Sequence, residues 1–236
     1  MKKENAFLRA ILPARCVFCG RVTALENGVC SDCFAALPVV GDKVCTHCGR
    51  DKKRCSCRKG LTFYDGVTAP FYYEGVVRRG VHSYKFRFKK PCAAYYGQFI
   101  AEKLVSQLPG QKFDYAVSVP VSKKKQRGRA FDHGELIARA AADELGIDYR
   151  GDILKKIYET DCQHDLGLLL RRGNLAGAFD VALPESVKGR RILLIDDIMT
   201  SGETLNECAK MLCLAGAESV HCAVLAVTEL KKKEQK

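Results

Sequence analysis

The sequence contains no apolar run that approaches the ~20 residues of a membrane-spanning helix. Its opening segment, MKKENAFLRAILPARC, carries two lysines and a short apolar stretch that Arg9 interrupts. The segment also lacks a small-residue cleavage site, which argues against a secretory signal peptide. We therefore expect a cytoplasmic protein that does not insert into a membrane.

The sequence has fewer acidic than basic residues. The chain has 27 Asp and Glu against 39 Lys and Arg, which gives a net charge of +12 over 236 residues. Such an excess favours anionic partners, and both phosphorylated small molecules and nucleic acid qualify. Part of it belongs to the residues after Leu230, which we expect to form a solvated basic tail over 231–236.

Cysteine, in contrast, is abundant and unevenly spread. Of the 13 cysteines, eight precede residue 58 and five are scattered over the rest of the chain. Disulfides are rare in a reducing compartment, so the clustering of eight cysteines in the first 58 residues, here called the head, indicates a use other than disulfide bonding. It predicts a cysteine-rich module over residues 1–58 and a larger domain over residues 59–230.

The spacing of the eight cysteines is typical of zinc sites. A Cys-x-x-Cys turn places two thiolates on one side of a tight knuckle, and two knuckles form a tetrahedral four-sulfur site. Gly20 and Gly49 directly follow two of these pairs, where a positive φ is often needed. Few large apolar residues are present, so metal would supply much of the stability of the module. Sequential pairing gives one or two structural Zn²⁺ ions, held by Cys16, Cys19, Cys30 and Cys33, and by Cys45, Cys48, Cys55 and Cys57.

Three alternatives to two sequential zinc sites stay open from the spacing alone. The last pair is Cys55-x-Cys57 rather than Cys-x-x-Cys, so only one site would be filled in one alternative. A cross-braced pairing is the second. The third replaces one thiolate by His47.

Basic side chains surround the cysteine knuckles, and two roles are open for them. The head is either a scaffold that docks on the larger domain or a reader of nucleic acid or protein. Few aromatic residues accompany the basic ones, so base stacking is not indicated. The basic residues are Arg15, Arg21, Lys43, Arg50, Lys52, Lys53, Arg54, Arg58 and Lys59.

The larger domain alternates strand-like and helix-like segments, which predicts an α/β fold with a mostly parallel sheet flanked by helices. We expect a strand or hairpin over 63–73, and strands over 116–121, 153–157, 179–181, 192–195 and 220–227. Helices are expected over 91–108, 132–146 and 205–214. The second helix has Asp132 as N-cap, Glu135 in the reciprocal capping position and Gly146 at its end.

The segment ILLIDDIMTSGET, residues 192–204, predicts a phosphate-binding site. A buried strand leads to Asp196 and Asp197, whose carboxylates can accept hydrogen bonds from a ribose diol, directly or through Mg²⁺. A polar turn then precedes a helix, and such a turn can surround a phosphate with N–H groups and hydroxyls. The turn consists of Thr200, Ser201, Gly202, Glu203 and Thr204. A plainer alternative is that Thr200-x-x-Glu203 or Thr204-x-x-Glu207 is a capping box and the Asp pair a solvated turn.

This string resembles the phosphoribosyl pyrophosphate (PRPP) loop of type I phosphoribosyltransferases. Together with the cysteine head, the chain resembles the ComF family of late-competence proteins, which join a double zinc ribbon to such a domain. Further landmarks are Pro13-Ala14-Arg15-Cys16, His82-Ser83-Tyr84-Lys85, Val119-Pro120-Val121, and Gln163, Arg171 and Asn174. In Arg129-Ala130-Phe131-Asp132-His133, the chain departs from the family's Arg-Gly-Phe-Asn-Gln, so recognition through amide groups is not expected there.

Four cationic side chains are expected to face the pyrophosphate. Arg127 and Arg129 lie in the basic segment SKKKQRGR over 122–129, which follows a predicted strand. Arg171 lies in the long polar connection 161–173, which is typical of a lid or binding loop. Lys85 is included through the resemblance. Cys162 and His164 offer a weaker nucleophile hypothesis, and Cys92, Cys208, Cys213 and Cys222 are expected to be small core residues.

The resemblance implies a phosphoribosyltransferase that binds PRPP with Mg²⁺ and acts in DNA uptake, with Asp196 and Asp197 as catalytic residues. Six-oxopurine transferases carry an aspartate where this chain has Thr200, which argues against hypoxanthine or guanine as acceptor. The alternatives are a PRPP sensor without turnover, a single-stranded DNA-binding competence factor that works with a DNA-translocating helicase, and a nucleotide-salvage enzyme.

Overall fold

A parallel sheet forms the centre of the protein in a computed structural model, which describes residues 14–23, 28–57, 60–86, 90–121, 131–157 and 177–229. Among these residues six strands form one sheet in the order β1-β8-β7-β3-β4, with β2 also paired to β8. All pairs in it are parallel. The strands are β1 (Gly66–Thr68), β2 (Phe71–Tyr72), β3 (Tyr115–Ser118), β4 (Asp148–Tyr149), β7 (Arg191–Met199) and β8 (Ser219–Val227).

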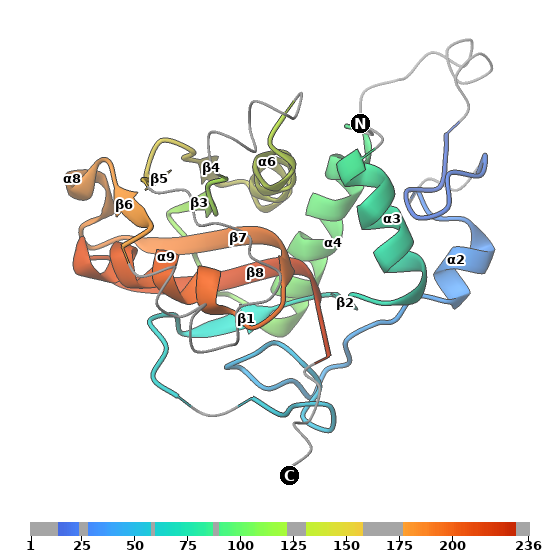
Figure 1. Ribbon diagram of the computed structural model, residues 1–236, viewed down its shortest axis with the longest axis horizontal. Helices are drawn as coiled ribbons and strands as arrows, with labels where there is room; N and C mark the ends of the chain where they lie inside the picture. The colour runs from blue at the N-terminus through green and yellow to red at the C-terminus, as the bar shows by residue number, and fades with distance from the viewer. Residues whose placement is uncertain are drawn as a thin grey trace.

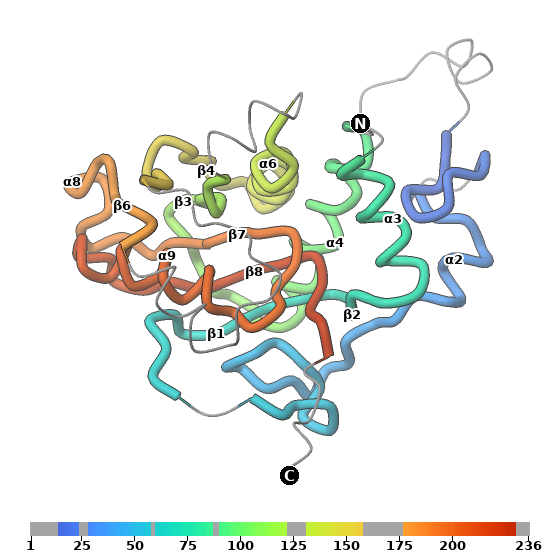
Figure 2. The backbone as a smooth tube through the Cα atoms, in the orientation of Figure 1, coloured from blue at the N-terminus to red at the C-terminus, as the bar shows by residue number. Residues whose placement is uncertain are grey.

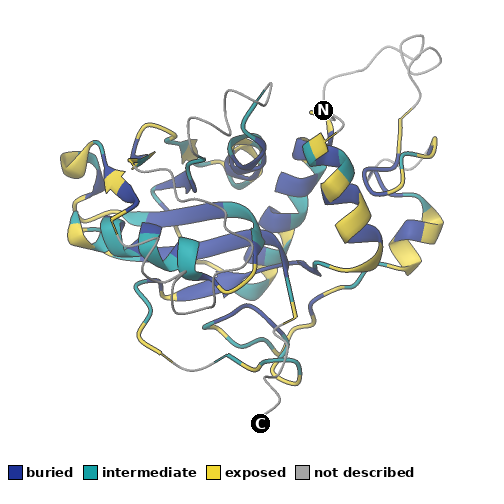
Figure 3. Ribbon diagram, in the orientation of Figure 1, coloured by how far each residue is buried: buried dark blue, intermediate teal, exposed yellow. Residues whose placement is uncertain are grey.

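Side chains along β7 alternate between the two faces of the sheet, because successive residues of a strand point to opposite sides. Leu193 and Ile195 pack with helices α3 (Gly75–Phe86), α4 (Cys92–Gln107) and α6 (His133–Leu145). Ile192 and Leu194 pack with α9 (Glu203–Leu214) on the other face. Figures 1 and 2 show this three-layer arrangement, and Figure 3 shows that the central strands are buried on both faces.

A second, two-stranded antiparallel sheet lies beside α9. It consists of β5 (Leu154–Lys156) and β6 (Phe179–Val181), and the short helix α8 (Pro184–Val187) follows it. No described helix is long and apolar enough to cross a membrane.

Most predicted elements of the larger domain are confirmed, and α6 is confirmed in detail. Asp132 caps this helix by accepting hydrogen bonds from the N–H groups of Gly134 and Glu135, and Gly146 ends it with φ 65°. Glu135 does not show the capping-box interaction predicted for its side chain. Its carboxylate instead accepts two hydrogen bonds from Arg139, one turn later.

Two strand predictions are confirmed in position and corrected in detail. The segment 63–73 forms no hairpin, since β1 and β2 both run parallel to β8. The strand predicted over 192–195 continues to Met199, because Asp196, Ile198 and Met199 still pair with β8. The Asp pair therefore lies within an ordered strand rather than in a solvated turn.

Both halves of the cysteine-rich head dock on the larger domain. Phe18, in the first knuckle, packs against the rings of Phe71, Tyr96 and Phe99. Tyr96 donates a hydrogen bond to the Val17 carbonyl at 3.1 Å. The first half includes the short helix α2 (Ser31–Ala35), and the second half lies beneath the sheet in Figure 1.

Candidate functional site: the carboxylate cluster, the phosphate turn and two thiolate clusters

The Asp pair of β7 lies beside Lys85, the penultimate residue of α3. The Lys85 Nζ is 2.7 Å from Asp197 Oδ2, and only about a fifth of either side chain is exposed (21% and 16%). Lys85 thus reaches the predicted ligand site from another element, as its assignment to the site requires. In the present structure it neutralises Asp197.

Asp196 is in an unfavourable place for a negative charge. Burial, followed by the charge of Asp197, raises the pKa of Asp196 to about 8. Its Oδ1 accepts a hydrogen bond from the Asp197 backbone N–H at 2.8 Å, which offsets part of the burial. A ligand that brings a cation or hydroxyl donors to this pair would relieve the repulsion between the carboxylates.

Asp132 is a third carboxylate at the site, which the sequence analysis named as a helix cap and as part of the departing motif 129–133 but not as a site residue. A Cβ placed on Gly134 would lie 3.5 Å from Asp132 Oδ1 and 3.9 Å from Asp196 Oδ1, so both carboxylates approach the first turn of α6. Burial raises the pKa of Asp132, against the backbone donors of Glu135 and Gly134. The family motif that contains Phe131-Asp132-His133 is the sequence feature that could have placed Asp132 in the site.

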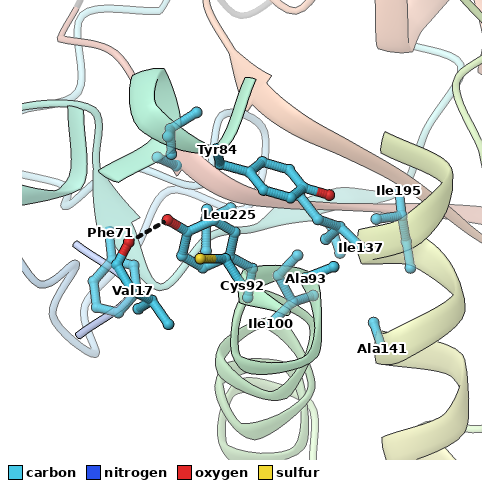
Figure 4. Packing of buried hydrophobic residues seen from close by; sticks show 14 of the residues in the cluster. Val17, Phe71, Tyr84, Cys92, Ala93, Ile100, Ile137, Ala141, Ile195 and Leu225 are labelled. Atoms are coloured by element: carbon cyan, nitrogen blue, oxygen red, sulfur yellow. Dashed lines mark hydrogen bonds between the residues drawn. The ribbon is translucent and has the colours of Figure 1, made fainter. Parts of the chain in front are cut away.

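A pair of hydrogen bonds fixes α3 against α6 and so brings Lys85 and Asp132 to one place. Tyr84 O–H donates to the His133 carbonyl at 2.9 Å, and His133 Nε2 lies 3.1 Å from the Tyr84 carbonyl. The two rings meet edge to face at 4.8 Å. Tyr84 is fully buried against Ile137 and Ile195 in the core of Figure 4.

The turn formed by residues 200–204 links β7 to α9, and Gly202 sets its shape. Gly202 is the N-cap of α9, with φ 86° and no side-chain capping hydrogen bond. A larger residue would be strained by this positive φ, whereas the nearest atom to its Cβ, Met199 Cε at 2.7 Å, is the end of a flexible side chain that can move. The capping-box alternative is therefore wrong, since neither Thr200 nor Thr204 occupies the capping position.

The eight head cysteines form two compact clusters with the predicted sequential membership. Within each cluster the four sulfur atoms all lie within 4.8 Å of one another. Pairs such as Cys19–Cys30 at 3.7 Å and Cys45–Cys57 at 3.8 Å match the ~3.8 Å separation that Zn–S bonds of ~2.3 Å impose in a tetrahedron. A cross-braced pairing and a His47 ligand are excluded; the His47 ring lies near Thr62 instead. Gly20 and Gly49 have the predicted positive φ, 79° and 67°.

Comparison with known proteins finds two domain families in the chain. The family model of the double zinc ribbon domain matches residues 7–65, and that of the phosphoribosyl transferase domain matches residues 132–236. The DNA utilization protein YhgH of Salmonella typhimurium is 28% identical, over 92% of this chain and 98% of its own length. Competence protein F of Haemophilus influenzae is 27% identical over 90% and 96%, and Competence protein ComFC of Streptococcus pneumoniae 27% over 83% and 86%.

The two domain models and these relatives support assignment of the chain to the ComF family. Its fold is accordingly a type I phosphoribosyltransferase domain preceded by a double zinc ribbon, and the two cysteine clusters are structural zinc sites.

The described basic residues of the double zinc ribbon do not form one surface. Arg50 is fully buried, which corrects its inclusion among residues available to a partner. Arg54 pairs with Glu74 and Glu229 and stacks over the Tyr72 ring, so it holds the ribbon on the larger domain. Docking, the first of the two roles predicted for the head, is thus observed.

Other predicted residues lie outside the described part of the chain: Arg127, Arg129, Arg171, Cys162, His164, Arg58, Lys59 and the tail over 231–236. Their assignments remain predictions. Of the cysteines expected in the core, Cys92, Cys208 and Cys222 are buried, and Cys213 is half-buried with its thiol donating to the Phe63 carbonyl.

Proposed function

We propose that this ComF-family protein binds PRPP with Mg²⁺ at the carboxyl end of β7 and that it acts in DNA uptake during natural competence. The observation that supports this most strongly is the Asp196–Asp197 pair, which leads through the glycine turn at 200–204 into the N-terminus of α9. Open α/β sheets bind ligands at this edge, and a helix N-terminus favours a phosphate. The role in DNA uptake rests on the names of the relatives.

In this proposal each group has a separate task. The 200–204 turn holds the 5-phosphate, and Asp196 and Asp197 bind the ribose diol. Lys85, Arg127, Arg129 and Arg171 face the pyrophosphate. Mg²⁺ would be held through the pyrophosphate and the Asp pair, and it supplies positive charge that stabilises the pyrophosphate.

As an enzyme, the protein would transfer the phosphoribosyl group to a nitrogen acceptor. The acceptor nitrogen forms a bond to the anomeric carbon while the bond from this carbon to the pyrophosphate oxygen breaks, and pyrophosphate leaves with the electron pair. Positioning and electrostatic stabilisation of the leaving group supply the catalysis. The same site without turnover would be a PRPP sensor, and with an ordinary base as acceptor a salvage enzyme.

Asp197→Asn is expected to weaken PRPP binding in the presence of Mg²⁺ by on the order of a hundredfold, because it removes a charge from the diol site and leaves Lys85 unpaired. Titration calorimetry measures the affinity. Asp148→Asn, at an exposed carboxylate of β4, is the matched control and should bind as the unaltered protein does. Equal affinity of the two variants would contradict the assignment of Asp197.

An acceptor screen distinguishes the enzyme from the sensor. The protein is incubated with PRPP, Mg²⁺ and a panel of nucleobases, and pyrophosphate release is measured. Release with one base identifies the acceptor. Binding without release from any base favours the sensor, and absence of binding contradicts the proposed function itself.

A second candidate, single-stranded DNA binding, is favoured by the exposed lysines of the second ribbon. Lys43, Lys52 and Lys53 are exposed, and the Lys52 N–H donates to the Lys43 carbonyl, so they gather at one tip. Replacing all three with glutamine should weaken binding of an oligonucleotide and lower the slope of log affinity against log salt by about two. PRPP affinity should not change. A slope that stays the same would show that the DNA contacts lie elsewhere.

A further inference from the structure

Arg50 is the largest fully buried side chain of the described protein, and its position joins the second zinc ribbon to the ligand site. Its Nε donates to the Thr228 carbonyl at 2.6 Å, and its Nη2 donates to the Thr200 carbonyl at 2.7 Å. Thr200 begins the 200–204 turn, and Thr228 follows β8. Arg50 thus bridges the carboxyl ends of two adjacent strands of the central sheet.

The backbone of Arg50 is itself part of the second thiolate cluster. The Arg50 carbonyl accepts from the Cys45 N–H at 2.8 Å, and the Arg50 Nη1 donates to the Cys48 carbonyl at 3.4 Å. The knuckle therefore fixes the Cα from which the guanidinium extends. A tetrathiolate zinc site carries net negative charge, which compensates a buried guanidinium that has no carboxylate within 4.0 Å among the described residues.

The hydrogen bond from Arg50 to the Thr200 carbonyl sets the direction of the backbone N–H group that follows it in the chain. A trans peptide is planar, and its C=O and N–H point in opposite directions. Fixing the Thr200 oxygen toward the ribbon therefore turns the Ser201 N–H toward the opposite side. Among the described residues no protein group accepts from the N–H of Ser201 or Gly202, so both are available to a ligand oxygen.

We infer that Arg50 is a positioning residue for the 200–204 turn, which it holds with the backbone N–H groups of Ser201 and Gly202 directed at the phosphate of the ligand. This inference rests on the proposed function. It gives the second zinc ribbon a task in ligand binding, since the knuckle at Cys45 and Cys48 anchors Arg50. Arginine suits this position because its planar fork reaches two carbonyls at once, whereas lysine offers a single point of charge.

Arg50→Met tests the inference, because methionine keeps most of the apolar volume and removes every donor. PRPP affinity with Mg²⁺ is expected to fall by at least about tenfold, the loss expected from removing a charged hydrogen bond. Hydrogen exchange at the Asn206 amide, which donates to the Gly202 carbonyl of the turn at 2.9 Å, should accelerate by a similar factor, and Arg50→Lys should recover part of both effects. Each variant is checked for its zinc content, which should remain that of the unaltered protein.

Arg54→Met is the matched control. Arg54 belongs to the same ribbon and holds it on the larger domain through Glu74 and Glu229. Among the described residues Arg54 makes no hydrogen bond to the 200–204 turn. The variant should lower thermal stability without changing PRPP affinity or the exchange of the Asn206 amide. If Arg50→Met and Arg54→Met alter affinity equally, Arg50 acts only through general stability and the inference is wrong.

The two proposals fail in different ways. If the unaltered protein does not bind PRPP, the proposed function fails, and exchange of the Asn206 amide alone decides whether Arg50 positions the 200–204 turn. If the unaltered protein binds PRPP and Arg50→Met binds it equally well with unchanged amide exchange, the inference about Arg50 is overturned and the proposed function stands.

Discussion

Cys33→Ser is expected to release the metal from the first thiolate cluster and to unfold the first zinc ribbon. Apart from the buried cysteines, this ribbon contributes only Val17, Phe18 and Val29 to the hydrophobic core in the part of it that the structure describes. Structural zinc contributes about 10–16 kcal/mol to folding in isolated ribbons, far more than the ~0.5–3 kcal/mol of an ordinary substitution. Zinc content should fall from two ions per chain to one, and the unfolding temperature by roughly 10 °C or more.

Cys208→Ala is the matched control for this zinc prediction. Cys208 is fully buried on the α9 side of the sheet and belongs to neither cluster. Its replacement should leave two zinc ions per chain and lower the unfolding temperature by only a few degrees. If Cys33→Ser retained two zinc ions, or a single zinc ion were found in the unaltered protein, the assignment of two separate tetrathiolate sites would be wrong.

The features that the sequence predicted best are those whose partners lie nearby in the chain. The cysteine pairs meet within each ribbon, and α6 is capped by Asp132 and ended by Gly146, both at its own termini. The strand, Asp pair and turn over 192–204 are likewise one continuous segment. Local spacing and local hydrogen bonds suffice for all of these.

The features that the sequence did not predict depend on distant partners. Arg50 looked like one member of a solvated basic run, but its acceptors lie 150 and 178 residues away in the chain. Helix α3 carries three valines and two glycines, which are weak helix formers, and it is helical because its buried face packs in the core around Tyr84. Whether residues 63–73 form strands or a hairpin stayed open in the sequence because the common partner of β1 and β2, β8, follows some 150 residues later.

Gly97→Ala is expected to destabilise the larger domain by about 3 kcal/mol, although the same change in an exposed helix usually stabilises it by ~1 kcal/mol. Gly97 lies in the middle of α4, where this helix crosses α6. A Cβ at this position would lie 2.5 Å from the Ala141 nitrogen and 2.6 Å from Ala140 Cβ. These are backbone atoms and a short side chain that cannot rotate away, so the two helices must separate.

Urea unfolding measures this effect, and Gly134→Ala provides the control because it adds the same methyl group to a helix of the same core. The nearest atoms to a Cβ at Gly134 are carboxylate oxygens at 3.5 and 3.9 Å, an ordinary contact distance. Gly97→Ala should lower the urea midpoint with little change in the slope, while Gly134→Ala should leave the midpoint the same or higher. If both variants behave alike, the close approach of α4 and α6 is not what requires glycine. Because α6 presents Asp132 and its first turn to Asp196, a shift of this helix should weaken PRPP binding by the folded Gly97→Ala protein as well.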